Sequence, residues 1–385
     1  MNLAYTPEQR AFRAEAREWM AANVPPHPLP SFDLTREGFE AHRDWERKLN
    51  EGRWGMVTWP EDLGGRGLDY TRWLIFEEEY YRAGAPTRVN QNGIFLLGPT
   101  MMEYGTPEQK ARFLPRMAAG DEIWAQAWSE PGAGSDLAGV RATATRAKNE
   151  AGGDDYVLNG QKIWSSRAVF ADWAFGLFRE PGSERHKGMS LVLFPLDAPG
   201  VTVRPIERMD GEMVFAEIFL DNVRVPLADR LGDEGQGWAV CMATAGFERG
   251  LLLRSPARYQ VGVTRLIALY QARKDQLPAS MAERVAQCWM DAEAYALAIY
   301  AMVSKLDAGG KIGPESSTNK IFWSELDIAI TSAAMDILGP EAELTGHDSS
   351  WLDDYVFALA GPIYAGSNEI QRNIIAERML GLPRA

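Results

Sequence analysis

The hydrophobic pattern of this chain changes its period twice, and this limits the folds that the chain can adopt. Up to about residue 122 the apolar side chains recur at helical spacing, as Phe12 and Ala16 do. From about residue 123 they alternate, and after about residue 232 they return to helical spacing. The alternating runs are separated by short Gly, Pro and Asp turns that leave no room for crossover helices. Their sheet should therefore be antiparallel.

We therefore expect an α+β multidomain protein. It should have an N-terminal all-α domain over residues 1–122, a middle antiparallel, barrel-like β domain over 123–232 and a C-terminal four-helix bundle over 233–385. A chain of 385 residues is long enough for two or three domains.

Several local signals refine this picture. Thr6 and Thr106 each precede Pro-Glu-Gln, the pattern of a capped helix start. Asn159-Gly160 between two strand-like runs predicts a two-residue hairpin turn. Further strands are expected at 174–178, 189–196, 201–206 and 214–220. The bundle helices are expected near 238–271, 280–308, 315–338 and 364–380.

Composition excludes several classes of partner and site. The chain has 40 Lys and Arg against 53 Asp and Glu, a net charge of −13, which argues against nucleic acid or an anionic membrane as a partner. No apolar run suits a membrane span, and the N-terminus does not resemble a targeting peptide, so a cytoplasmic location is expected. Cys241 and Cys288 suit buried free thiols. The four histidines show no metal-ligand spacing, so no metal is expected.

Three segments carry residues suited to a planar, polar ligand. Residues 126–136 form a Gly and Ser loop that allows close backbone approach. Residues 160–166 place a Trp before two Ser, a possible ring wall followed by hydroxyl donors. Residues 362–372 form a Gly-Ser turn that leads into a helix N-terminus. Each alone is equally typical of a plain loop, a core Trp or a capped helix.

Together and in this order, the segments resemble the acyl-CoA dehydrogenase family over essentially the whole chain. The family's A-x-x-x-T-E-P-x-A-G-S-D is similar to residues 125–136, with Ser129 in place of Thr. Its G-x-K-x-W-I-T is similar to residues 160–166, and its I-Y-E-G-T-x-x-I-Q-R to residues 363–372. The run Asp-Asn-Val-Arg-Val-Pro at 221–226 matches the family's closing strand.

The resemblance implies an FAD enzyme that converts an acyl-CoA thioester to its trans-2-enoyl product. A carboxylate would take the α proton while the β hydrogen leaves as hydride to the flavin. Ser135 would lie near both the cofactor and the CoA arm. By motif position, the residues expected at the cofactor are Gln126, Trp128, Ser129, Ser135, Trp164, Ser166, Ser367 and Glu369.

The expected catalytic base departs from the commonest family pattern. Ala365 stands where that pattern has its glutamate, and alanine cannot accept a proton. A branch of the family has its base in a Glu-Arg pair on the first bundle helix, which Glu248 and Arg249 match. Glu248 is therefore the candidate base, with a solvent-exposed ion pair as the alternative reading and Glu369 as the second acid. Arg249 and the backbone N–H of Ala365 would act at the substrate.

Other departures from the family's motifs leave the oligomeric state and the partner proteins undecided. Of the family's Arg-x-x-Phe-Gly, which reaches the neighbouring subunit's FAD, only Arg273 remains, and the Gly-rich run is altered at 336–340. The resemblance implies a homodimer or homotetramer that passes electrons to an electron-transferring flavoprotein. The alternatives are a related oxidase or desulfinase and a non-catalytic subunit of a hetero-oligomer. Gly98 suggests room for a bulky or branched acyl group.

Overall fold

The structure, a computed structural model, describes residues 4–249, 255–344 and 350–383, without the side chains of Glu248 and Arg249. These residues form two units, and each combines segments that are distant in the sequence. The unit we call the sheet unit comprises Pro25–Leu68 and Pro86–Glu248. The unit we call the helical unit comprises Met1–Val24, Asp69–Ala85 and Arg249–Ala385.

The predicted capped helix starts are confirmed. Helix α1 (Pro7–Asn23) follows Thr6 and helix α5 (Pro107–Ala119) follows Thr106, and both threonines form complete capping boxes. The other elements of this region are α2 (Arg36–Glu51), α3 (Tyr70–Arg82), the π-helical segment η2 (Asn92–Leu97) and α4 (Gly98–Tyr104). Short 3₁₀ turns are η1 (Glu61–Leu63), η3 (Leu137–Gly139), η4 (Leu227–Asp229), η5 (Lys274–Gln276) and η6 (Gly339–Glu343).

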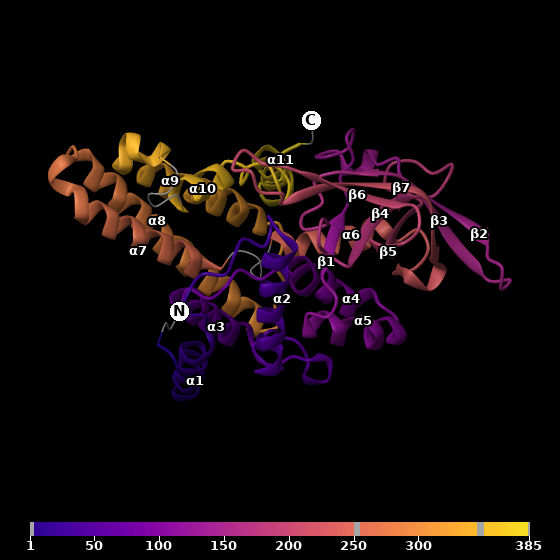
Figure 1. The fold of residues 1–385 in the computed structure, drawn as a ribbon, viewed down its shortest axis with the longest axis horizontal. Helices are drawn as coiled ribbons and strands as arrows, with labels where there is room; N and C mark the ends of the chain where they lie inside the picture. Colours follow the sequence, from indigo (N-terminus) through magenta and orange to yellow (C-terminus); the bar gives the residue numbers. More distant parts are fainter. Residues whose placement is uncertain (1–3, 250–254, 345–349, 384–385) are drawn as a thin grey trace. The chain divides into compact units, whose positions relative to one another are not determined.

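The middle of the chain forms one eight-stranded sheet (Figure 1). Its main path runs β6-β7-β3-β2-β4-β5-β8, and β1 pairs with β4 off that path. The prediction of an antiparallel sheet is confirmed, except that the pairs β1·β4 and β2·β4 are parallel. The strands are β1 (Trp124–Ala127), β2 (Thr143–Lys148), β3 (Asp154–Lys162), β4 (Trp173–Arg179), β5 (Met189–Pro195), β6 (Val201–Ile206), β7 (Phe215–Pro226) and β8 (Arg230–Leu231).

The predicted hairpin at Asn159-Gly160 is wrong, because β3 runs straight through both residues. The pairing of β3 with β7 shifts register there, so that Leu158 faces Val223 and Gly160 faces Leu220. The extra residue of this bulge lies in β7, where Asn222 takes a φ of 53°. Gly160 serves close packing instead, since a Cβ there would lie 2.7 Å from Ala142 Cα.

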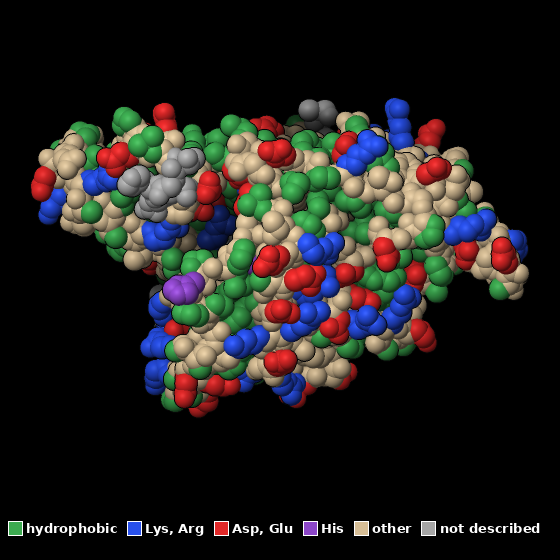
Figure 2. Space-filling model, in the orientation of Figure 1, with side chains coloured by type: hydrophobic (Ala, Val, Ile, Leu, Met, Phe, Trp, Pro, Cys, Tyr) green, Lys and Arg blue, Asp and Glu red, His purple; other side chains and the backbone are tan. Residues whose placement is uncertain are grey.

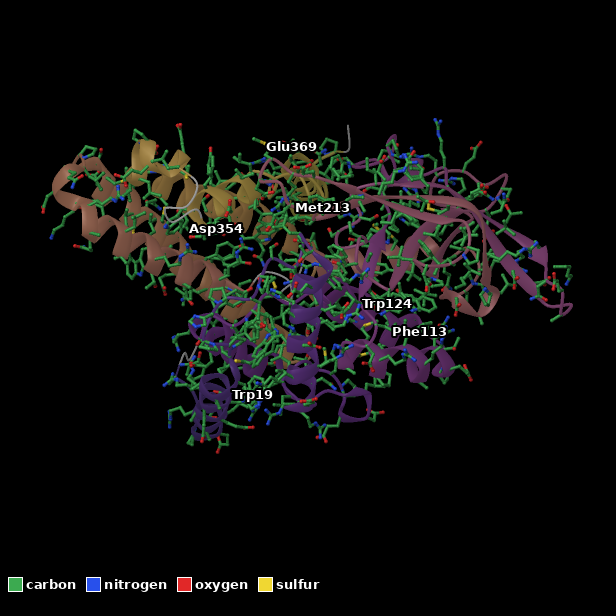
Figure 3. All side chains as sticks on the ribbon, viewed as in Figure 1. Trp19, Phe113, Trp124, Met213, Asp354 and Glu369 are labelled. Carbon is green, nitrogen blue, oxygen red and sulfur yellow. The ribbon has the colours of Figure 1, made fainter. Side chains whose placement is uncertain are left out.

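Aromatic packing joins helix α5 to the sheet within the sheet unit. The Phe113 ring meets Trp124 of β1 and Trp173 of β4 edge-on, with ring centroids 5.4 and 5.3 Å apart (Figure 3). The Asn90 side chain adds polar links, because it donates to the carbonyls of Met117 and Glu122 and accepts from Trp124 N. This packing fixes the start of β1, the strand that leads into the first motif segment.

The helical unit contains the long helices α7 (Pro256–Arg273), α8 (Ser280–Asp307) and α9 (Ser316–Leu338), which lie side by side (Figure 1). The single helix predicted at 238–271 is instead two helices, α6 (Gly237–Arg249) and α7. Ser255 caps α7 and Pro256 occupies its first turn. The helix predicted at 364–380 begins later, as α11 (Asn368–Ile374), and ends in the π-helical turn η7 (Ile375–Met379); α10 (Ser350–Ala358) was not predicted.

The surface and the cysteines agree with the composition. Acidic and basic side chains are interspersed over the face shown in Figure 2. Cys241 and Cys288 are buried free thiols, as predicted. Within the described stretches, no helix has the length and apolar character that crossing a membrane requires.

The expectation that Gly98 leaves room for a bulky acyl group is wrong. A Cβ at Gly98 would lie 2.2 Å from Cζ2 of the Trp59 ring, so the indole already fills that space. Trp59 is itself buried. Gly98 therefore serves packing between α4 and the loop that carries Trp59.

Replacing Gly98 with alanine is expected to destabilise the protein by about 1–3 kcal/mol, because the new methyl group overpacks against Trp59. Guanidinium denaturation of wild type and Gly98→Ala measures the change. Gly262→Ala is the matched helical control, since its Cβ would meet only Ile330 at an ordinary 3.8 Å. Equal stability of Gly98→Ala and wild type would contradict the packing role.

Candidate active site

The first motif segment leaves the end of β1 in the sheet unit. Gln126 and Ser129 are half-buried, and the Trp128 ring is 7% exposed and packs edge-on against Phe175. Ser135, farther along the loop, is exposed. The parallel pairing of β1 with β4 sets the direction in which this segment leaves the sheet.

The second segment continues from β3. Trp164 has a φ of 61° and its side chain is 57% exposed, which is unusual for the largest apolar residue. Ser165 exchanges two backbone hydrogen bonds with Ala216, and Ser166 accepts one from the Asn92 side chain. The backbone on both sides of Trp164 is thus anchored, and its indole lies on the surface.

These two segments meet, although they are distant in the sequence. The backbone N–H of Ile163 donates to the Ser129 carbonyl at 2.9 Å. Lys162 Nζ donates to the Trp128 carbonyl at 3.3 Å. Trp128 and Ser129 therefore lie beside the end of β3 that leads to Trp164 and Ser166.

The residues of this structure fit a flavin ring system. Trp164 presents a planar aromatic face, and Ser129 and Ser166 add half-buried hydroxyls. Among the described residues, Trp128 Nε1 and Ser165 Oγ are buried without a hydrogen-bond partner. Such a surface combines a stacking wall with polar groups, which a flat, heteroatom-rich ring requires.

The third segment lies in the helical unit. Ala365 and Gly366 take φ values of 57° and 80°, which forms a sharp turn before Ser367 caps α11. The Gln371 side chain donates to the carbonyls of both Ala365 and Gly366. The N–H of Ala365 has no partner among the described residues, so it is available to an acceptor.

Asn368 anchors this turn to α9. Its side-chain oxygen accepts from Lys320 Nζ at 2.7 Å and from Ser324 Oγ at 3.2 Å, and its backbone N–H donates to Pro362 O. Lys320 is fully buried. Lys320 was not predicted as a site residue, because it lies outside the motif.

Glu369 is poorly suited to be the base. It lies in the first turn of α11 and is exposed (Figure 3). Hydrogen bonds from its own backbone N–H and from the Ser367 side chain lower the pKa of its carboxyl. A lowered pKa makes a weaker proton acceptor, which disfavours Glu369 further.

Glu248 and Arg249 form the last turn of α6. Their side chains lie outside the described residues, so their roles stay predictions. Arg273 ends α7, and its guanidinium donates to Glu341 at 2.6 Å within the same unit. Whether Arg273 contributes to a neighbouring cofactor site also stays a prediction.

One polar feature of the site was not predicted from the sequence. Lys162 is fully buried and pairs with Glu130 at 2.8 Å, and the Glu130 carboxylate also accepts from the N–H groups of Arg141 and Ala142. Burial lowers the pKa of Lys162, while the Glu130 charge opposes that shift. The alternation of β3 was the available signal, because Tyr156, Leu158 and Lys162 share one face.

Comparison with known proteins agrees with this geometry. The N-terminal, middle and C-terminal domains of acyl-CoA dehydrogenases match residues 6–121, 125–223 and 235–380. The acyl-CoA dehydrogenase IpdE1 of Mycolicibacterium smegmatis is 41% identical, with 98% of each chain covered. This chain belongs to the acyl-CoA dehydrogenase family. The family is one of FAD-dependent oxidoreductases, and its expected fold of helical, sheet and helical parts is confirmed.

Other acyl-CoA dehydrogenases extend the comparison. The human mitochondrial short-chain specific acyl-CoA dehydrogenase is 31% identical, with 83% of this chain and 78% of that protein covered. The solved structure of a Tcur3481-Tcur3483 steroid ACAD has a TM-score of 0.88 at 26% identity, and the ChsE4-ChsE5 complex of Mycobacterium tuberculosis has 0.82 at 32%. Both comparisons cover the whole of each chain.

Proposed function

We propose that this chain catalyses FAD-dependent α,β-dehydrogenation of an acyl-CoA thioester to the trans-2-enoyl-CoA. The observation that carries the proposal is the meeting of the Trp128-Ser129 and Trp164-Ser166 segments through the Ile163 to Ser129 hydrogen bond. An exposed indole and half-buried hydroxyls thus belong to one local structure. FAD, when bound there, supplies an acceptor for the β-hydride.

The chain's own residues have separate tasks in this proposal. Trp164 and Trp128 flank the ring system, Gln126, Ser129 and Ser166 bind its polar edge, and Ser135 lies at its outer side. By motif position, Ser367 and Glu369 are also proposed as cofactor residues. The carbonyl oxygen of the thioester accepts a hydrogen bond from the Ala365 N–H, which stabilises charge that develops on that oxygen.

Glu248 takes the α proton in this proposal. Ala365 has no side chain that can accept a proton, so the base must come from elsewhere, and Glu248 occupies the position used by one branch of the family. A carboxylate shielded from water is a stronger base than one in solution. Arg249 holds the end of α6 and the substrate beside it.

The names of the relatives suggest which substrates to test first. One solved relative is called a steroid ACAD, which supports an acyl group attached to a fused-ring skeleton. We therefore place ring-bearing acyl-CoA thioesters ahead of straight-chain ones. An electron-transferring flavoprotein is the proposed acceptor, and the cytoplasm is the proposed location.

A second candidate function is a subunit of a hetero-oligomer whose partner supplies the base. Ala365 and the altered run at 336–340 favour it, and so does the similarity to the ChsE4-ChsE5 complex, whose name gives two components. In that case the lone chain would bind FAD without reducing it. A homodimer or homotetramer is the assembly expected of the first candidate.

The purified chain is expected to bind FAD and to oxidise an acyl-CoA with an artificial electron acceptor faster than with oxygen. Flavin absorbance gives the stoichiometry, and product analysis identifies the enoyl-CoA. Faster turnover in air than with the acceptor would indicate an oxidase. Activity only after co-expression with a second acyl-CoA dehydrogenase chain would favour the hetero-oligomer, and absence of FAD binding would contradict both candidates.

A further inference from the structure

A buried ion pair lies directly beneath the two segments that form the cofactor surface of the sheet unit. Lys162 Nζ donates to Glu130 Oε1 at 2.8 Å, to the Leu177 carbonyl at 2.6 Å and to the Trp128 carbonyl at 3.3 Å. These three acceptors match the three donors of an ammonium group. The Lys162 side chain is fully buried, and that of Glu130 is 8% exposed.

Both oxygens of the Glu130 carboxylate also accept hydrogen bonds. Oε1 accepts from Lys162 and from Ala142 N at 2.9 Å, and Oε2 accepts from Arg141 N at 2.6 Å. The backbone of Glu130 exchanges two hydrogen bonds with Ala133. The pair therefore connects the loop after β1, the residues directly before β2, and the end of β3.

The strand ladder does not provide this connection. Strand β1 pairs with β4, whereas β3 pairs with β2 and β7. The segments that follow β1 and β3 are joined by Ile163 N to Ser129 O and by Lys162 to Trp128 O. Both bonds come from consecutive residues at the end of β3, so the position of Lys162 controls both.

We propose that Lys162 and Glu130 are positioning residues that hold Trp128 and Ser129 at a fixed distance from Trp164 and Ser166, and thereby pre-form the FAD surface. The inference rests on the proposed function in so far as the ligand is FAD. An apolar pair could fill the same volume, but it could not fix the Trp128 carbonyl, because only a directional donor does that.

Because an apolar pair could fill the volume but not fix the Trp128 carbonyl, variants of the pair should affect FAD affinity and protein stability differently. Breaking the pair in Glu130→Gln or Lys162→Met leaves an uncompensated buried polar group, which lowers the melting temperature by roughly 5–15 °C. The double variant Glu130→Gln/Lys162→Met removes both charges and should regain at least half of that loss. It still lacks the tether to Trp128, so FAD affinity should not return.

The test titrates FAD onto apoprotein and follows flavin fluorescence. In both single variants and in the double variant, the FAD dissociation constant is expected to rise roughly 10- to 100-fold, the range for residues that orient a ligand-binding group. Glu46→Gln is the control, because Glu46 is 1% exposed and accepts from Arg88 Nε and Asn90 N. It touches neither segment, so its melting temperature should fall while FAD affinity stays within about twofold of wild type.

Two results would overturn the proposal. One is that FAD affinity falls and rises together with the melting temperature across all four variants, so that the double variant regains affinity as it regains stability. The other is wild-type affinity in the single variants. Either would show that the pair contributes stability alone.

Hydrogen exchange of the Ile163 amide in apoprotein provides a readout that needs no cofactor. Exchange should be faster in Glu130→Gln and in the double variant than in wild type, and unchanged in Glu46→Gln. If wild type binds no FAD, the proposed function fails while this exchange still decides whether the pair holds the segments together. Equal Ile163 protection in wild type and in the variants would overturn the positioning role.

Discussion

Replacing Glu248 with glutamine is expected to slow flavin reduction by acyl-CoA about 100- to 10,000-fold, the usual contribution of a general base. Glutamine keeps the shape of the side chain but accepts no proton. The FAD content should not change, because Glu248 is not among the residues proposed to bind the flavin. Stopped-flow absorbance of the holoprotein, mixed anaerobically with substrate, measures the rate.

Two matched variants make this result specific. Glu234→Gln removes an exposed carboxylate just before α6 that pairs with Arg146, and its rate should stay within about twofold of wild type. Glu369→Gln removes the second acid and should leave proton abstraction in place. A full rate in Glu248→Gln together with a large loss in Glu369→Gln would move the base to α11.

The second large effect concerns stability and pH. Asp33 is 4% exposed, and burial raises the pKa of its carboxyl to about 6, with the nearby Glu212 charge adding to the rise and Arg167 opposing it. The folded protein therefore binds this proton more tightly than the unfolded chain, whose aspartates titrate near 3.9. The contribution of Asp33 is fully present below about pH 4 and is lost as pH rises through about 6.

Asp33→Asn should therefore be more stable than wild type at pH 8, by up to about 3 kcal/mol for a shift of about two units. The difference should shrink toward zero near pH 4. Urea denaturation of both proteins at several pH values measures it. Asp44→Asn is the control, because Asp44 is exposed and pairs with Arg47 in its own helix. A difference that does not vary with pH would contradict a raised pKa at Asp33.

Local patterns predicted much of the fold. The threonine caps of α1 and α5 involve residues within three positions, so sequence alone fixes them. Strands β4 to β7 were predicted as strand-like runs bounded by Gly, Pro and Asp turns, and the structure confirms them. The break between α6 and α7 was missed, although Ser255-Pro256 is a cap and first-turn signal, because the apolar spacing continues across it.

The errors arise where distant segments decide the local structure. Asn159-Gly160 is a good turn sequence, yet pairing with β2 on one side and β7 on the other keeps β3 extended. Gly98 indicated an open pocket only because the position of Trp59 was unknown. Such long-range contacts cannot be predicted from the local spacing of residues.

The candidate site was predicted in part. The residues around Trp128 and Trp164 were predicted from the motif match, and the structure brings those two segments together. The ion pair of Lys162 and Glu130 was missed because a charged residue in a strand usually faces solvent. The buried Lys162 ammonium needs the Trp128 and Leu177 carbonyls and the Glu130 carboxylate as acceptors, and no single stretch of sequence reveals all three.

The central claim is tested most directly by mixing the FAD-loaded wild-type chain anaerobically with straight-chain, branched and ring-bearing acyl-CoA thioesters while recording flavin absorbance. We predict that the oxidised flavin band disappears with at least one thioester and that an equal amount of enoyl-CoA forms. An unchanged flavin band with every thioester, in a chain that holds FAD, would contradict dehydrogenation by this chain alone.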